Sequence, residues 1–139
     1  MTVVYDAGAL IAAERSDREV WADHRARLET GLAPVTTAPV VAQVSRSGRQ
    51  AQLRRFLRGC EIVPFAADEA HEVGALAAKS RSSDVVDIHV VVVAHRLRRP
   101  VLTRDQDDLD PIADAVSGAV RIQSLSPPAQ SHAPRRRTR

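Results

Sequence analysis

The chain has 139 residues, of which 44% are hydrophobic, so it is long enough for one globular domain and too apolar for a disordered segment. The net charge of +3 is unevenly spread, because residues 126–139 hold four arginines and no acid, and subtracting these four leaves −1 for residues 1–125. Aromatic residues make up only 3%, which argues against base stacking as the main way of holding nucleic acid. A single cysteine excludes a disulfide framework and a thiolate metal cluster.

The first residues, MTVVYDAGALIAA, lack the basic start of a secretory signal. The valine run at 90–93 is far too short to span a bilayer. We therefore expect a cytoplasmic protein that does not bind a membrane.

Short β-branched runs alternate with helical patterns along the chain. Residues 2–5 predict a buried strand that runs into a loop at Asp6 and Gly8. Further strands are predicted at 34–37, 61–65, 100–103 and 120–125. Helices are predicted at 17–31, from Pro39 to Val44, at 50–58 and at 67–79.

The segment 84–98 fits two interpretations, because its valine content favours a strand and its length favours a helix. Strands that alternate with helices indicate an α/β domain with a mainly parallel sheet. Residues 126–139 are rich in proline and arginine, and we expect a disordered basic tail there. The alternative for the tail is weak, salt-sensitive affinity for nucleic acid.

Carboxylates follow two of the predicted strands at the same edge of such a sheet. Asp6 follows the first strand and Asp105 follows the strand at 100–103, and ligands of parallel sheets bind outside the carboxyl ends of the strands. The run SSDVVDIH adds Asp84 and Asp87, which share one face if this segment is helical. Converging carboxylates without paired histidines are typical of a site for Mg²⁺ or Mn²⁺. Because such an ion activates water and offsets the charge of a phosphate, the pattern favours phosphodiester hydrolysis.

Several of the acidic residues also have a simpler interpretation. Asp84 can cap a helix, and Asp105 or Asp108 can cap a short turn before Leu109. Capping is also the simpler interpretation for Asp107 and Asp110. Asp6 interrupts a buried apolar run and has no obvious helix to cap. Asp87 lies in a valine-rich stretch where an unpaired charge is costly. Asp6 and Asp87 are therefore the strongest functional candidates.

Four runs of sequence together resemble the PIN domain family, and within it the VapC-like toxins of type II toxin–antitoxin systems. They occur in the order and spacing of that family over about residues 2–125, and they read VVYDAGALIA, TTAPVVAQVSRSGR, SSDVVDIHVVVVAHRL and PVLTRDQDDL. The resemblance implies one PIN-like domain with a three-layer α/β/α sandwich and a mainly parallel central sheet, in which residues 84–98 are helical. It also implies a ribonuclease that depends on Mg²⁺ or Mn²⁺.

The same resemblance assigns roles to the acidic residues. Asp6, Asp87 and Asp105 match the catalytic metal ligands of the family. Asp84 and Asp108 match accessory acidic positions that some members have.

One position departs from the family pattern. Members usually have a glutamate where this chain has Gln43, whereas Thr103 matches a hydroxyl residue often found beside the last acid. Gln43 can position water or the ion through its carbonyl oxygen, but it brings no charge, so cation binding should be weaker. We therefore expect a weakened nuclease, with a catalytically impaired module that binds RNA or an antitoxin as the alternative.

The implied partners are RNA, a cognate VapB-like antitoxin and a second copy of the chain in a homodimer. Arg46, Arg49 and Arg104 are candidate contacts to RNA phosphates, and a solvated surface is the simpler interpretation for each of them. An acidic pocket would suit a basic side chain supplied by the antitoxin.

A phosphoacceptor receiver domain is the main rival interpretation, since it also places aspartates at strand ends. It requires a lysine after a late strand, and the only lysine, Lys79, lies in a predicted helix. No G-x-G-x-x-G follows the first strand, which argues against dinucleotide binding.

Overall fold

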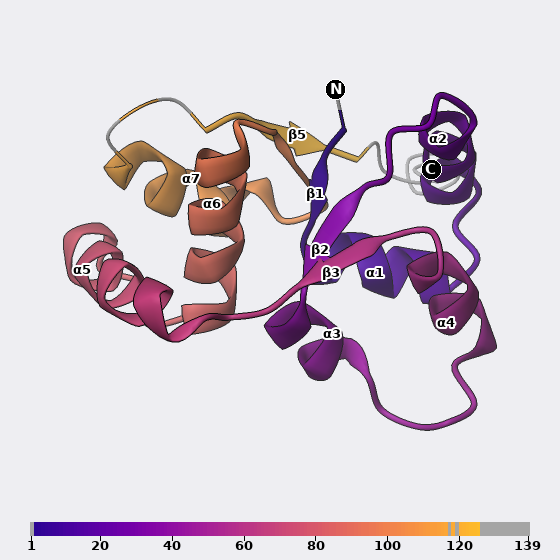
Figure 1. Cartoon of the computed structure of the whole chain (residues 1–139), viewed down its shortest axis with the longest axis horizontal. Coiled ribbons are helices and arrows are strands. Elements are labelled where there is room, and N and C mark those ends of the chain that lie inside the picture. The colour runs from indigo at the N-terminus through magenta and orange to yellow at the C-terminus, as the bar shows by residue number, and fades with distance from the viewer. Residues whose placement is uncertain (1, 117, 119, 126–139) are drawn as a thin grey trace, which may run out of the picture.

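A computed structural model describes residues 2–116, 118 and 120–125 of the chain. Within these residues, five parallel strands form one sheet in the order β3-β2-β1-β4-β5 (Figure 1). The strands are β1 (Val4–Tyr5), β2 (Val35–Thr37), β3 (Glu61–Val63), β4 (Val101–Thr103) and β5 (Ile122–Ser124). Val4 pairs with Val35 on one side and with Val101 on the other, so the first strand lies at the centre of the sheet. The carboxyl ends of β1 and β4 are therefore neighbours at one edge.

Helices cover both faces of this sheet. They are α1 (Ala7–Glu14), α2 (Arg18–Glu29), α3 (Ala38–Val44), α4 (Ala51–Leu57), the short 3₁₀ helix η1 (Ala67–Glu69), α5 (Ala70–Ser80), α6 (Val85–Leu97) and α7 (Gln106–Ala115). Figure 1 shows α5, α6 and α7 on one side of the strands and α1, α2 and α4 on the other. The predicted three-layer α/β/α sandwich is confirmed, and its described strands are all parallel.

The ambiguous segment is the helix α6, which packs against β1, β2 and β4 as well as α5 and α7. Because it is enclosed on several sides, all residues from Ile88 to Ala94 are buried. A helix buried all round has no polar stripe, and this explains why its sequence also suits a strand. Asp84 caps it by accepting a hydrogen bond from the Asp87 N–H at 3.0 Å.

Two helices differ from the prediction. The loop expected after the first strand is α1, and the expectation that Asp6 has no helix to cap is wrong, because its Oδ1 accepts the Ala9 N–H at 3.1 Å. The short turn expected before Leu109 is the first part of α7, which continues through Pro111. This helix is held by burial of Leu109 and Ile112, which are three positions apart and face the core together.

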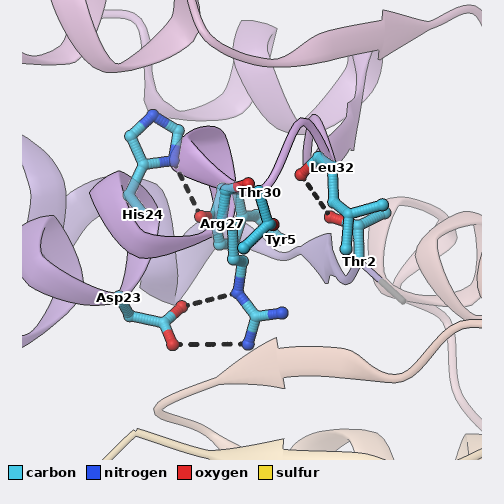
Figure 2. Close-up of polar contacts among 7 residues, drawn as sticks. All are labelled: Thr2, Tyr5, Asp23, His24, Arg27, Thr30 and Leu32. Carbon is cyan, nitrogen blue, oxygen red and sulfur yellow. Dashed lines mark hydrogen bonds and ion pairs between the residues drawn. The ribbon is translucent and has the colours of Figure 1, made fainter.

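The helix α2 is fastened to the sheet and to α4 through a buried histidine. The Tyr5 hydroxyl lies 2.8 Å from Nδ1 of His24 (Figure 2), and the His24 ring stacks on Phe56 of α4 at 3.8 Å between centroids. Burial lowers the pKa of His24, so this imidazole is neutral. On another side of α2, Arg27 and Asp23 form an ion pair at 2.8 Å, also drawn in Figure 2. This histidine is therefore part of the core and not of an active site.

No helix in the described part of the chain is both long enough and apolar enough to cross a membrane. The predicted basic tail, residues 126–139, lies outside the described residues.

Candidate functional site

The carboxyl edge of the sheet carries Asp6, which is only 3% exposed. Both of its oxygens are engaged, since Oδ1 accepts the Ala9 N–H and Oδ2 accepts a hydrogen bond from the Thr103 hydroxyl. The pKa of Asp6 is raised to about 6, first by burial and then by the nearby charge of Asp105, against the lowering effect of these hydrogen bonds. The fold therefore holds this carboxylate in a fixed orientation, and no lysine or arginine of the described residues pairs with it.

Thr103 joins β4 to the same site. It is fully buried at the end of the strand, and while its hydroxyl donates to Asp6 its oxygen accepts the Asp105 N–H at 2.8 Å. Thr103 thus orients the side chain of one predicted ligand, Asp6, and fixes the backbone of another, Asp105. The hydroxyl position matched by the family resemblance has a clear structural role here.

The first turn of α6 supplies the next two carboxylates. Asp87 is half-buried, and its pKa is raised to about 7, first by burial and then by the charge of Asp84. The two carboxyl groups lie within hydrogen-bond reach, and the charges of Asp6 and Asp108 also contribute to this raised pKa. Asp84 itself is exposed at the helix start. Three of the predicted acids, Asp84, Asp6 and Asp108, therefore act electrostatically on a fourth, Asp87.

The N-terminus of α7 brings the remaining acids. Asp105 is the residue before the helix, its side chain makes no capping hydrogen bond, and it is exposed. It lines a hollow of about 410 Å³ together with Arg104, Asp107, Asp108 and Ser124. Carboxylates are tolerated at this position because the helix N-terminus carries a partial positive charge.

The five predicted acids, Asp6, Asp84, Asp87, Asp105 and Asp108, thus lie near one another at one edge of the sheet. None of them forms an ion pair with lysine or arginine within residues 2–116, 118 and 120–125. Their donor atoms are all oxygens, the kind that Mg²⁺ and Mn²⁺ take. No three His, Cys, Asp or Glu side chains of the described residues lie close enough together to form a ready-made metal cluster. The chemistry fits a hard cation that keeps several of its waters, since such an ion needs only one or two direct carboxylates.

The remaining predicted residues lie around this cluster. Gln43 is exposed on α3, and no hydrogen bond joins it to the acidic residues among those described. Arg46 and Arg49 are exposed in the segment between α3 and α4. Arg104 lines the acidic hollow, but its guanidinium also forms an ion pair with Asp17, the residue that caps α2.

Two features of the site were missed from the sequence. A Cβ on Gly8 would lie 3.4 Å from both the Arg104 N and Asp6 Oδ1, so glycine permits the chain after β4 to pack closely against the start of α1. The Asp17–Arg104 ion pair joins residues 87 positions apart, and no local pattern could reveal it. For the close packing at Gly8, the only signal in the sequence was a glycine two positions after Asp6.

A family model described as the PIN domain matches residues 3–115. The chain belongs to the PIN domain family. Members of this family are typically metal-dependent nucleases. The family resemblance seen in the sequence is therefore confirmed at the level of the PIN domain.

Searches of known proteins add support for the fold. No curated protein matches the chain. Five chains of solved structure match, and one is the crystal structure of PAE2754 from Pyrobaculum aerophilum. It aligns with a TM-score of 0.57 over 88% of this chain and 90% of that one, at 13% sequence identity. At this identity the likeness supports the PIN fold alone.

Proposed function

We propose that this PIN domain protein is a VapC-like toxin, an endoribonuclease that hydrolyses RNA phosphodiester bonds with Mg²⁺ or Mn²⁺. The observation that carries the proposal is the group of carboxylates that meet at the carboxyl edge of the sheet, none of which pairs with a lysine or arginine of the described residues. Two of them, Asp6 and Asp87, have a raised pKa, first because they are buried and then because neighbouring carboxylates repel them. Mutual repulsion of this kind is relieved by a bound cation.

Asp6, Asp87 and Asp105 would hold the ion, with Asp84 and Asp108 adding negative charge. A bound divalent ion would activate a water molecule and offset the charge of the scissile phosphate. Thr103 keeps Asp6 oriented through its donated hydrogen bond and keeps the backbone of Asp105 in place. The protein thus supplies fixed oxygens at one edge of a rigid sheet, which is the support that a catalytic site needs.

Gln43 is the reason to expect a slow enzyme. An amide in place of the family's usual glutamate removes one negative charge, and the affinity for a divalent cation should fall with it. A Gln43→Glu variant should bind Mn²⁺ several-fold more tightly than the wild type in isothermal titration calorimetry. Ala42→Glu is the matched control, because Ala42 is also exposed on α3 and its side chain points about 100° away around the helix. Equal or weaker binding by Gln43→Glu would contradict this role.

The proposal includes partners and a location. RNA would contact Arg46, Arg49 and Arg104 through its phosphates, and the protein would act in the cytoplasm. The proposed protein forms a homodimer and binds a VapB-like antitoxin. The antitoxin would offer a basic side chain to the acids of the site, which form no ion pair with the described residues.

A second candidate is a PIN-like module that binds RNA or an antitoxin without turnover. It is favoured by the neutral side chain of Gln43 and by the lack of a ready-made three-ligand cluster in the described chain. This module would bind equally well with and without EDTA, whereas an enzyme would lose its activity.

The deciding experiment is an RNA-cleavage assay with Mn²⁺ or Mg²⁺ and with EDTA. The wild type should cleave only with metal, and Asp6→Asn should be inactive. Asp68→Asn, an exposed substitution in η1, is the matched control and should retain activity. Cleavage that persists in EDTA or in Asp6→Asn would refute the proposal.

A further inference from the structure

A second hollow lies beyond the far end of α1 from the acidic cluster. It has a volume of about 370 Å³, and its lining includes Arg18, Trp21 and Arg25 of α2 and Gln52 and Arg55 of α4. We refer to these five residues as the arginine groove. No acidic residue lines it among those described. Its volume lies within the range of roughly 300–1000 Å³ that is usual for ligand sites.

The sequence builds this groove from two helix faces. Arg18 and Arg25 are seven positions apart, which places them on the same side of α2, and Gln52 and Arg55 share a side of α4 in the same way. Trp21 packs edge-on against Phe56 with 5.0 Å between ring centroids, so the two helices are held together at the floor of the groove. The walls are therefore fixed by core packing.

One arginine of the groove is held in place, and none of the three is paired with an acid of the described residues. The guanidinium of Arg55 lies 4.7 Å from the centre of the Trp21 ring, and the indole is itself fixed because its Nε1 donates to the Ala13 carbonyl at 2.9 Å. In the described part of the chain, Arg18, Arg25 and Arg55 form no ion pair with a carboxylate. Because the guanidinium of Arg55 is already oriented, less entropy is lost when an anion binds to it.

The groove connects to the acidic cluster through one ion pair. Arg104 lines the acidic hollow and pairs with Asp17, and the next residue along, Arg18, lines the groove. A strand of RNA leaving the acidic cluster past Arg104 would therefore reach Arg18 first. Arg18 and Arg25 are about 10 Å apart along α2 at 1.5 Å per residue, which is too far for both to hold one small anion and suits two different phosphates of one strand.

We propose that the arginine groove binds the sugar-phosphate backbone of single-stranded RNA upstream or downstream of the phosphate held at the acidic cluster. The identity of this ligand rests on the proposed ribonuclease function. Single-stranded nucleic acid is commonly bound in positively charged grooves that follow its backbone, and an Arg–Trp pair at the floor fits that mode.

The test is the binding of a fluorescein-labelled oligouridylate of about 12 nucleotides, measured by fluorescence anisotropy in EDTA over a range of salt concentrations. The variant carries Arg18→Gln, Arg25→Gln and Arg55→Gln together. Each phosphate contact adds about 0.7 to the slope of log affinity against log salt, so the slope should fall by about 2 and the affinity in about 0.1 M salt by about 100-fold.

A matched triple variant carries Lys79→Gln, Arg99→Gln and Arg121→Gln, which removes the same charge outside the groove. It should retain the wild-type slope. Should the groove variant fail to fold by circular dichroism, Arg25→Gln alone, at an exposed position, should lower the slope by about 0.7. Equal slopes for the groove and control variants would overturn the proposal, as would tighter binding of polyglutamate than of the RNA. EDTA prevents metal-dependent cleavage, so this binding assay does not depend on catalysis. A protein that binds RNA in the groove but does not cleave it when Mn²⁺ or Mg²⁺ is present would refute the proposed ribonuclease and leave the groove proposal standing.

Discussion

Replacing Asp87 with asparagine should stabilise the metal-free protein. The pKa of Asp87 is raised from 3.8 to about 7, first by burial and then by the charge of Asp84. At about 1.4 kcal/mol per pKa unit the full shift corresponds to about 4 kcal/mol, and solvent screening of a half-buried group reduces this to about 2 kcal/mol. Between the two pKa values the folded chain keeps a proton that the unfolded chain has lost, so stability falls as pH rises through this range and stays low above it.

The assay is thermal unfolding in EDTA from about pH 4 to about pH 8. Asp87→Asn should raise the melting temperature by about 6 °C at the upper pH and flatten the decline seen in the wild type. Asp114→Asn, an exposed substitution in α7, is the matched control and should follow the wild-type curve. Asp87→Asn with an unchanged or lower melting temperature at the upper pH would refute the claim that burial and the neighbouring charges disfavour this carboxylate.

One further substitution tests a hydrogen bond that supports the site, and another tests a hydrogen bond of the core. Thr103→Val should lower the free energy of unfolding by about 2 kcal/mol above pH 7, where Asp6 is ionised, and by less near pH 5, because it removes a hydrogen bond to a charged group. Thr36→Val is its control in urea titrations, since Thr36 donates to the neutral Tyr5 carbonyl, and equal pH dependence of the two variants would contradict the role of Thr103. Tyr5→Phe should cost about 1–3 kcal/mol because it leaves Nδ1 of buried His24 without a donor, and a melting temperature equal to the wild type would show that this bond is unimportant.

Much of the fold could be predicted because strand and helix signals are local. The β-branched runs predicted every strand of the described sheet to within a few residues. The helix predicted at 17–31 corresponds to α2, and the φ of +77° at Gly31, just after this helix, suits glycine. The two missed helices lack such signals. The sequence of α1 is apolar nearly all round, and α7 contains Pro111 within a run of acids.

The candidate site was only partly visible in the sequence. The strand-end positions of Asp6 and Asp105 predicted a common edge, and the structure brings them near each other there. Asp87 could be identified as a candidate because an unpaired charge in a valine-rich, buried stretch is costly unless it has a function. The arginine groove was missed because it depends on the packing of α2 against α4, and Arg18 and Arg25 alone look like an ordinary solvated helix face.

The central claim is that carboxylates from separate segments share one divalent ion. The most direct measurement is a crystal structure of the protein soaked in Mn²⁺, with the ion located by its anomalous scattering. The account predicts one peak at the carboxyl edge of the sheet, with oxygens of Asp6, Asp87 and Asp105 around it directly or through water. A peak elsewhere, or none at this edge, would contradict it.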